Sequence, residues 1–224
     1  MSVMTESQRI IDLSTPLYDG IRGLTTEPDT SIEVEGYNTM MLHLYSHTGT
    51  HMDAPKHFVA GGGAIDQVNL QACVGTARVI DVTAVEANGV ICIADLGAAA
   101  ARIGAGSRVL LRTDWHRHVD ADDFRSHMPR VSLQLAQWLL QRQVALLGME
   151  QPSVASVRPE NRQELTDVHR ALLQGGVVIV EGLCNLDQLK QEQVQFVALP
   201  LRLRDCDGSP VRAIAIEKSS GGVS

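Results

Sequence analysis

Short apolar runs recur along the chain and alternate with segments of helical periodicity. Four runs of aliphatic and β-branched residues predict buried strands, at 77–82, 108–112, 144–148 and 177–180. Residues 93–102 and 132–143 carry apolar side chains at helical spacing, and Ser132 is placed to cap the second segment. A third helix is predicted over 160–174. Strands that alternate with helices predict an α/β fold, here a single domain with a mixed β-sheet core flanked by helices.

The first part of the chain has a weaker pattern. Residues 1–9 are polar and predict a flexible start, and 10–17 predicts a short strand that ends near Pro16. The stretch 21–31 is rich in Thr and Gly and is interpreted as an irregular loop, which either covers a pocket or only connects two strands. Residues 31–46 alternate enough to predict a strand or hairpin.

The segment LYSHTGTHMDAPKHF, residues 44–58, holds four candidate groups: His47, His51, Asp53 and His57. The residues TGT between the first two histidines are poor helix formers and Pro55 would end a helix, so the spacing predicts a strand and a turn. A straight strand would hold His47 and Asp53 roughly 20 Å apart, at about 3.3 Å per residue. The chain must therefore bend if both are to reach one ion, and Gly49 and the Ala54–Pro55 bond lie where the bend is needed.

Two imidazoles and a carboxylate form a ligand set suited to Zn or Mn. Three protein ligands leave a coordination position open for water, as a catalytic site requires. The alternative interpretation is a polar turn whose histidines are only solvated.

Two more candidates lie in the second half of the chain. His169 comes four residues after Leu165 on the apolar stripe of the helix at 160–174, and a buried imidazole needs a partner. Taken alone, His169 is more typical of a hydrogen-bonded core histidine. Glu181 changes that interpretation, because it ends the apolar run 177–180, where a carboxylate is costly to bury unless it is paired or bound to a metal.

The other histidines are given structural roles. His43 lies four residues before His47, the same spacing as between His47 and His51. It is interpreted as a structural residue or as a residue that supports a ligand. His116, His118 and His127 lie in an Asp-rich stretch, 115–130, that is interpreted as a solvated loop. The aromatic residues Phe58, Tyr45 and Trp115 are equally compatible with a cavity wall and with the core.

The sequence HTGTHMDAPKHF, residues 47–58, resembles the signature of the cyclase family of metal-dependent hydrolases, which includes bacterial kynurenine formamidase, isatin hydrolase and a lactone-opening relative. The likeness extends to DLSTPL, LLRTDW, GMEQPS and ALPLR, and so runs from about residue 11 to about residue 216. It implies a swivelling β/β/α-like arrangement. Glu150 stands where the family often has Asp, and Ala155 where an acid often follows, which affects the substrate assignment more than the chemistry.

The resemblance also implies a ligand set. His47, His51 and Asp53 would hold a first ion, and Asp53 and Glu181 would bridge to a second ion held by His169. Some relatives work with one manganese, so one or two ions of Zn or Mn are expected.

A hydrolytic reaction follows from such a site. A divalent ion polarises a carbonyl and lowers the pKa of bound water towards ~7, which supplies hydroxide for attack on the carbonyl. His57, whose unperturbed pKa is near ~6.5, is the candidate acid/base, and the resemblance gives the matching histidine that role. The expected enzyme hydrolyses the C–N bond of a small linear or cyclic amide, or opens a lactone, and an arylformamide or an isatin-like lactam is the expected substrate type. The loop at 21–31 has no tryptophan, in contrast to the formamidase, which weakens the case for kynurenine chemistry.

Two other classes of function stay open. The first is a metal-dependent lyase or cyclase acting on a small organic acid, in which His57 would remove a proton from carbon. The second is a non-catalytic module in which the metal only stabilises the fold.

Composition narrows the partners and the compartment. The chain has 224 residues, 44% hydrophobic and 20% charged, as expected for one soluble globular domain. A net charge of -7 argues against nucleic-acid binding, and neither a signal peptide nor a membrane span is evident. The four cysteines include no C-x-x-C pair, so a cytoplasmic protein with reduced thiols is expected. The expected partners are a small-molecule substrate and, by the resemblance alone, further copies of the chain in a dimer or tetramer.

Overall fold

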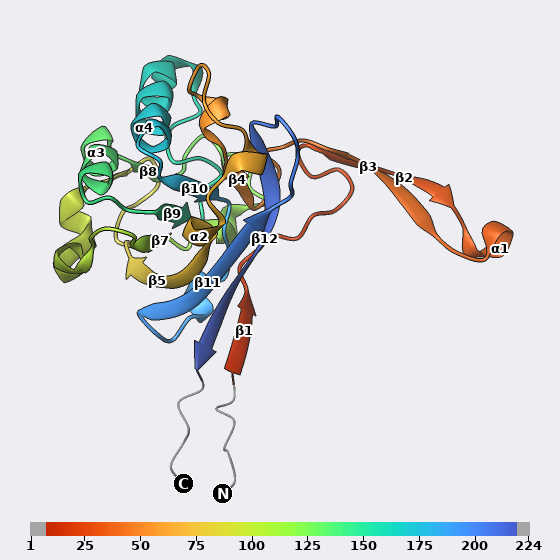
Figure 1. The fold of residues 1–224 in the computed structure, drawn as a ribbon, viewed down its shortest axis with the longest axis horizontal. Helices are drawn as coiled ribbons and strands as arrows, with labels where there is room; N and C mark the ends of the chain where they lie inside the picture. Colours follow the sequence, from red (N-terminus) through yellow and green to blue (C-terminus); the bar gives the residue numbers. More distant parts are fainter. Residues whose placement is uncertain (1–7, 219–224) are drawn as a thin grey trace, which may run out of the picture.

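The computed structural model describes residues 8–218, and its main element is an eight-stranded sheet in the order β1-β12-β11-β5-β7-β9-β10-β4 (Figure 1). In that order, the strands are Gln8–Asp12, Gly208–Lys218, Gln193–Pro200, Val74–Asp81, Arg108–Arg112, Leu146–Met149, Val178–Glu181 and His51–Asp53. The four strands β5, β7, β9 and β10 are parallel to one another, and the remaining pairs are antiparallel. The sheet is therefore mixed, as predicted.

The sheet closes on itself at its shortest strand. β4 pairs with β10 on one side and with β12 on the other, so the strands from β12 to β4 form a ring, and β1 adds to the outer side of β12. This closure brings β4, which carries His51 and Asp53, next to the end of β10. This is the position in which Glu181 can meet His51 across the strand pair.

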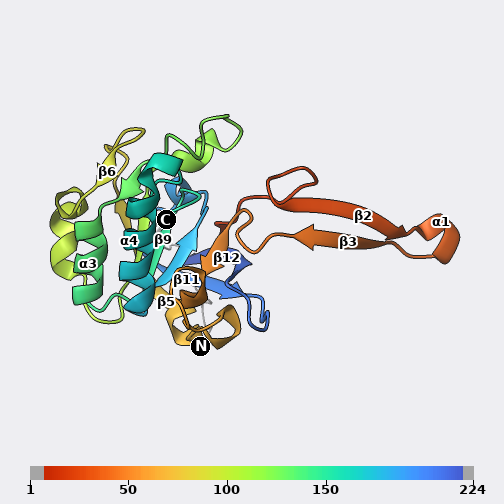
Figure 2. The same ribbon diagram turned by 90° about the horizontal axis from the view of Figure 1, so that it is seen from above.

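Helices cover one side of the sheet. α3 (Leu133–Gln141) and α4 (Arg162–Gln174) lie side by side there in both ribbon views (Figures 1 and 2), and α2 (Leu70–Cys73) precedes β5. Two further strands, β6 (Val90–Ile91) and β8 (Arg130–Val131), pair with each other. Six 3₁₀ segments complete the described part: Pro55–His57, Ile65–Gln67, Ile93–Arg102, Trp115–His118, Pro159–Asn161 and Leu186–Gln188. None of the helices within residues 8–218 is long and apolar enough to cross a membrane.

The core lies on both faces of the sheet. Alternate residues of β7 show the division, because Val109 and Leu111 pack with the α3–α4 side and Leu110 packs inside the ring with Phe196. All four are at most 1% exposed, so the strand is buried on both faces. This explains why the parallel strands appear in the sequence as continuous apolar runs.

The strands and helices predicted from residue 77 onwards are confirmed apart from one helix. The four apolar runs form β5, β7, β9 and β10, and the hydroxyl of Ser132 caps α3 by accepting a hydrogen bond from the Leu135 amide at 3.0 Å. The helix predicted over 93–102 is a 3₁₀ segment instead. Gly97 interrupts it with a φ of 51°, because this glycine adopts a left-handed conformation that no regular helix continues through.

The prediction of an irregular loop over residues 21–31 is wrong. Residues Leu24–Thr30 form β2, which pairs with β3 (Thr39–Leu44) in a hairpin whose tip is the short helix α1 (Ile32–Glu35). We call residues 24–44 the arm, because Figures 1 and 2 show it projecting away from the rest of the molecule. Both faces of the arm are open, so β2 needs no apolar alternation and its sequence LTTEPDT resembles a loop.

The start of the chain also differs from the prediction. A strand was expected over residues 10–17, but β1 covers Gln8–Asp12. It begins earlier because Gln8 and Arg9 pair with Lys218 and Glu217 of β12, and it ends where the pairing with β12 ends, at Asp12. The flexible start predicted for 1–9 otherwise concerns residues 1–7, which lie outside the described residues.

Candidate metal centre and cavity

The motif forms a turn followed by a strand, as predicted. Residues 46–50 turn, with Gly49 at a φ of 57°, and β4 then begins at His51. A positive φ is strained for residues other than glycine, so the glycine allows the bend that brings His47 back towards Asp53. His47 Nδ1 lies 2.9 Å from Asp53 Oδ1, far closer than a straight strand would place them.

The second pair of candidates reaches the same point from other elements. Glu181 is the last residue of β10 and lies opposite His51 in the strand register, with Oε2 at 3.2 Å from His51 Nε2. His169 extends from α4 and places Nε2 at 3.5 Å from Glu181 Oε1 and 3.7 Å from Asp53 Oδ2. All five predicted ligands are therefore brought together.

The two most buried histidines turn a free nitrogen towards this cluster. His51 Nδ1 donates a hydrogen bond to the Gly49 carbonyl at 2.9 Å, and His169 Nδ1 donates to the Leu165 carbonyl at 2.7 Å. A carbonyl can only accept, so Nδ1 carries the proton in both rings. Each neutral imidazole then presents the lone pair of Nε2 to the carboxylates, which is how metal-binding histidines are commonly oriented.

Asp53 lacks the hydrogen bonds that a buried carboxylate requires. It is 1% exposed, and neither of its oxygens accepts a hydrogen bond from a residue between 8 and 218. The close approach of His47 lacks hydrogen-bond geometry. An uncompensated carboxylate in the interior costs several kcal/mol, on the order of the penalty for an unpaired buried ion.

The residues fit a divalent cation. Two overlapping groups each bring their ligand atoms within 4.8 Å of one another: His47, Asp53 and His57 in one, and His51, Asp53 and Glu181 in the other. Asp53 belongs to both groups and has two free oxygens. Nitrogen and carboxylate donors of this kind suit Zn or Mn.

The pKa values of the cluster show how strongly its charges interact. Burial lowers the pKa of His47, but the carboxylates of Asp53 and Asp207 outweigh it and raise the pKa to about 9. Burial likewise lowers the pKa of His169, but the neighbouring Glu181 carboxylate outweighs it, so the pKa is raised. Burial raises the pKa of Glu181, whereas His169 and His51 together hold it well below its usual range. The carboxylates therefore favour a positive charge at this cluster, which protons on His47 and His169 or a cation can supply.

His57 lies at the open side of the cluster. Its ring stacks on His47 with centroids 3.9 Å apart, and its side chain is 26% exposed, whereas His51 is 3% exposed. Burial is the largest influence on His57 and lowers its pKa.

Asp207 is a residue that the sequence analysis missed. Its Oδ2 lies 3.0 Å from His47 Nε2 and 3.4 Å from His57 Nδ1, so one carboxylate orients two rings. Burial raises the pKa of Asp207, but the interaction with His47 outweighs it and holds the pKa far below its usual value. Asp207 precedes Gly208, which pairs with Asp53 in the β12–β4 register. A Cβ at Gly208 would lie 2.7 Å from His47 Cε1, so the DG pair was a usable signal for close approach.

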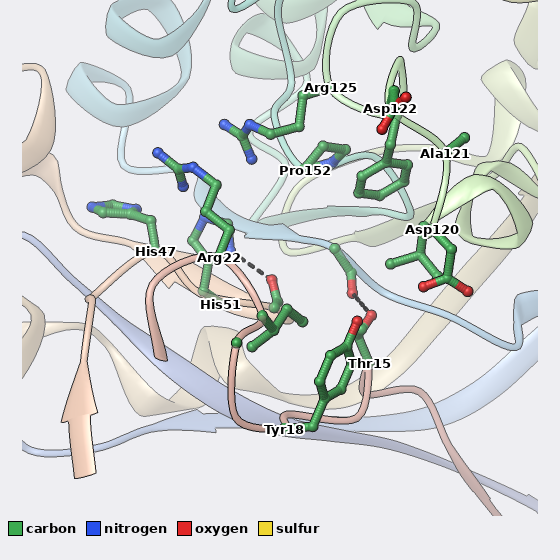
Figure 3. A pocket seen from close by; sticks show the side chains of 16 residues that line it. Thr15, Tyr18, Arg22, His47, His51, Asp120, Ala121, Asp122, Arg125 and Pro152 are labelled. Carbon is green, nitrogen blue, oxygen red and sulfur yellow. Dashed lines mark hydrogen bonds between the residues drawn. The ribbon is translucent and has the colours of Figure 1, made fainter. Parts of the chain in front are cut away.

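A cavity of about 410 Å³ opens beside the cluster (Figure 3). Its walls come from the turn of the motif, the segment 15–22 before the arm, and the segment 119–125, with Pro152 and Gly182 between them. The segment 119–125 was predicted to be only part of a solvated loop. It is held over the cavity because Trp115 Nε1 donates a hydrogen bond to the Phe124 carbonyl at 2.9 Å.

The other predicted roles are corrected in part. His43 lies on the arm, 58% exposed, and its one ion-pair contact in the described chain is with Glu27 at 3.4 Å, so it does not support a ligand. His116 is not solvated, since it is 16% exposed and contacts buried Glu150 at 2.8 Å. Phe58 stacks on His169 at 4.1 Å, whereas Trp115 belongs to the core at 6% exposure.

Comparisons with known proteins agree on one family. The family model described as "Putative cyclase" matches residues 11–156. Kynurenine formamidase of Bacillus cereus is 34% identical over 211 residues, which covers 91% of this chain and 95% of that protein. The structure named "predicted metal-dependent hydrolase from Bacillus stearothermophilus" is 26% identical, with a TM-score of 0.76 over 94% of this chain and 98% of that chain. Isatin hydrolase A from Ralstonia solanacearum is 24% identical and shares the fold, with a TM-score of 0.81 over 93% and 92% of the two chains.

Proposed function

Because this chain belongs to the cyclase family, we propose that it is a metal-dependent hydrolase of a small amide, cyclic amide or lactone. An arylformamide or an isatin-like lactam is the proposed substrate type, in keeping with relatives named kynurenine formamidase and isatin hydrolase. The observation that carries the proposal is Asp53, a buried carboxylate without a hydrogen bond from the described residues and next to three imidazoles.

The proposed ligands are the five residues that converge on that carboxylate: His47, His51, Asp53, His169 and Glu181. One or two ions of Zn or Mn would be held there, since Asp53 and Glu181 each have two oxygens and carboxylates can bridge. When bound, a divalent ion supplies Lewis-acid chemistry, which polarises a carbonyl and acidifies water.

The protein's own contribution to the reaction is proton transfer and orientation. His57 faces the open side of the cluster, and we assign it the role of accepting a proton from water and returning it to the leaving nitrogen or oxygen. Asp207 positions His57 and His47 through the same oxygen. The motif turn and the 119–125 segment form cavity walls that hold the substrate carbonyl beside the cluster.

The test combines metal analysis with a substrate screen. Purified protein is analysed for bound metal and then incubated with formamides, lactams and lactones in ¹⁸O-labelled water. We expect one or two equivalents of Zn or Mn and one ¹⁸O atom in the acid product. A product without label would indicate a lyase, and bound metal without turnover of any compound would indicate a structural metal.

We also propose that the protein is a homo-oligomer in which the arm packs against a second copy. Every residue of β3 before Leu44 is exposed, although three of them are Met40, Met41 and Leu42, each at least 55% exposed. The tip adds Val34 at 79% and Tyr37 at 56%. An isolated two-stranded hairpin is marginally stable in water, and an apolar patch of this kind is typical of a protein interface.

A further inference from the structure

The cavity contains two arginines that the metal centre does not use. Arg22 lies in the segment that leads into the arm, and Arg125 lies in the segment 119–125, on another wall. Neither forms a hydrogen bond or an ion pair with any residue of the described chain. The guanidinium of Arg22 lies over the ring of Tyr45, 5.3 Å from its centroid.

Among the partly buried arginines of residues 8–218, Arg125 alone has no hydrogen-bond or ion-pair partner. Arg112 contacts Asp114 at 2.7 Å, and Arg130 contacts Glu164 at 2.7 Å. Four other arginines also lack such partners, but all of them are exposed: Arg142, Arg162, Arg202 and Arg204. A partly buried guanidinium that points into a cavity without contacting a carboxylate therefore suggests that the anion comes from outside the chain.

Arg125 is the stronger of the two indications, because it is partly buried. Burial is the largest influence on Arg125 and lowers its pKa, and the nearby charge of Arg22 lowers it further. Glu181 acts in the opposite direction but does not contact Arg125. A charge removed from water is usually paired or hydrogen-bonded, whereas this guanidinium has no such partner among residues 8–218.

The two guanidinium groups face the same part of the cavity. Figure 3 shows both directed towards the side of His47 and His51, while the carboxylates of Asp120 and Asp122 lie on the other side of the view. Asp120 and Asp122 are exposed and form no ion pair with either arginine. They therefore leave the positive charge above the histidines uncompensated.

The charge of the metal centre does not cancel this pair. Asp53, Glu181 and Asp207 carry three negative charges, of which a single divalent cation would balance two, so the two guanidinium groups still leave the region positive. The positive potential of Arg22 and Arg125 then persists beside the reacting carbonyl. Arginine binds carboxylates with a planar fork of donors, so two of them can hold one carboxylate group from two directions.

We propose that Arg22 and Arg125 form a carboxylate-binding subsite, so that the amide, lactam or lactone hydrolysed by this enzyme carries a carboxylate group beside its reacting carbonyl. The reactive part of this inference rests on the proposed hydrolase function, whereas anion binding does not. The cavity volume of about 410 Å³ suits such a small acid.

The binding test uses benzoate, with benzamide as its neutral counterpart of the same shape. Titration calorimetry on the metal-loaded protein measures both, for wild type and for the variants Arg125→Met and Arg22→Met. We expect each substitution to weaken benzoate binding about 10-fold, the usual effect of removing one charge-assisted contact, and to leave benzamide unchanged. The matched control is Arg142→Met, because Arg142 lies over the Trp138 ring at 5.1 Å, as Arg22 lies over Tyr45, but does not line the cavity.

Several outcomes would overturn the subsite. Benzoate affinity that is equal in Arg125→Met and Arg142→Met, at equal metal content, would place the carboxylate on the metal instead. Tighter binding of phenyl phosphate than of benzoate would replace the carboxylate by a phosphate. If Arg125→Met does not fold, Arg22→Met decides the question, because Arg22 is exposed and its loss leaves the core intact.

The kinetic test compares N-formylanthranilate with formanilide, which lacks the carboxylate. Wild type should favour the acid in kcat/KM, and Arg125→Met should reduce that preference by about 10-fold or more, while Arg125→Lys retains part of it. Failure to hydrolyse either compound would count against the proposed function, whereas the benzoate titration would still test the arginines. A preference unchanged in Arg125→Met would overturn the assignment.

Discussion

The metal centre and the arm both depart from the usual distribution of side chains, the metal centre by burying carboxylates and the arm by exposing apolar groups. At the metal centre Asp53 and Glu181 are at most 3% exposed, although each is a carboxylate. On the arm Met41 and Leu42 are each 55% exposed, although each is apolar. Buried polar groups and exposed apolar patches are the informative exceptions to the burial rule.

Both regions lack a partner among residues 8–218, and the difference lies in what would complete them. The carboxylates need positive charge at the centre of a rigid sheet, which a divalent ion supplies. The arm needs apolar surface along a hairpin, which a second copy of the protein supplies. The first partner controls chemistry and the second controls assembly, so each can be removed separately.

Substitution of Asp53 by Asn tests the metal centre and has the largest expected effect. The change keeps the shape of the side chain but removes the negative charge of the one residue that both candidate ligand groups contain, the group with His47 and the group with His51. We expect loss of bound metal and a fall in kcat/KM of roughly 10³-fold, in line with removal of a central electrostatic group. Metal analysis and steady-state kinetics measure the two effects. Asp167→Asn is the matched control, because this carboxylate of α4 is half-buried and accepts a hydrogen bond from Gln163 but does not belong to the cluster.

Retention of metal and activity in Asp53→Asn would show that the cluster is complete without this carboxylate. Loss of metal with full activity would separate the ion from the reaction.

The substitution His57→Ala separates proton transfer from metal binding. Because His57 is the most exposed histidine of the cluster, its removal should leave metal content unchanged while kcat falls by about 10²-fold, the lower range for a general acid or base. The control is His127→Ala, which removes an imidazole that is 44% exposed and away from the cluster. Wild-type turnover in His57→Ala at equal metal content would remove His57 from the mechanism.

The sequence could predict the metal centre better than the arm, and the reason is physical. His47, His51, Asp53 and His57 lie in one short window whose glycine and proline set the bend, so the information is local. Glu181 and His169 are polar interruptions of apolar patterns, which the cost of burial makes visible. Beyond Leu24 no residue of β2 is buried, and a strand without a buried face leaves no alternation in the sequence.

Residues that long-range packing brings to the site could not be predicted from local sequence patterns either. Asp207 reaches His47 because β12 pairs with β4 across 155 residues of chain, from Asp53 to Gly208. Arg125 enters the cavity because the Trp115 indole, by donating a hydrogen bond to the Phe124 carbonyl, fixes its segment there. In both cases the residue types were visible, but their neighbours depended on the closure of the sheet and on one side-chain hydrogen bond.

Substitution of Met41 by Glu tests the arm. A charge in the apolar patch of β3 should oppose association and raise the dissociation constant of the oligomer by about 10²-fold, the effect of losing one strong contact. Analytical ultracentrifugation over a range of concentrations measures it. Thr25→Glu adds the same charge to the polar strand β2 and is the control. A wild type that is monomeric at every concentration would remove the arm from assembly.

Substitution of Gly208 by Ala tests how closely β12 must approach the metal centre. The added Cβ would lie 2.7 Å from His47 Cε1 and 2.9 Å from the Met52 carbonyl, so the ring must move away from Asp207. We expect a loss of stability of about 1–3 kcal/mol and a fall in kcat/KM of about 10-fold. Gly104→Ala is the control, since a Cβ there meets nothing within 4 Å. Equal kinetics for the two variants would show that His47 tolerates displacement.

The His116–Glu150 pair sharpens the comparison, because it is a buried polar contact completed within the chain. Glu150 accepts hydrogen bonds from the amides of Thr113 at 2.7 Å and Asp114 at 2.5 Å, and His116 contacts it at 2.8 Å. The hydrogen bond to Glu150 raises the pKa of His116, although burial opposes the shift. No external ion is required, so stability here should depend on protons alone.

The expected pH dependence follows from the direction of that shift. A pKa raised by folding stabilises the protein fully below the unfolded value of ~6.5, and this contribution is lost as pH rises through the higher folded pKa. His116→Gln should therefore lower the free energy of unfolding by about 1 kcal/mol at pH 6 and by less at pH 9. Denaturation of both proteins at saturating metal gives the difference, in which the other histidines cancel. A difference that grows with pH would mean that His116 is neutral when paired, and the contact would then be an ordinary hydrogen bond.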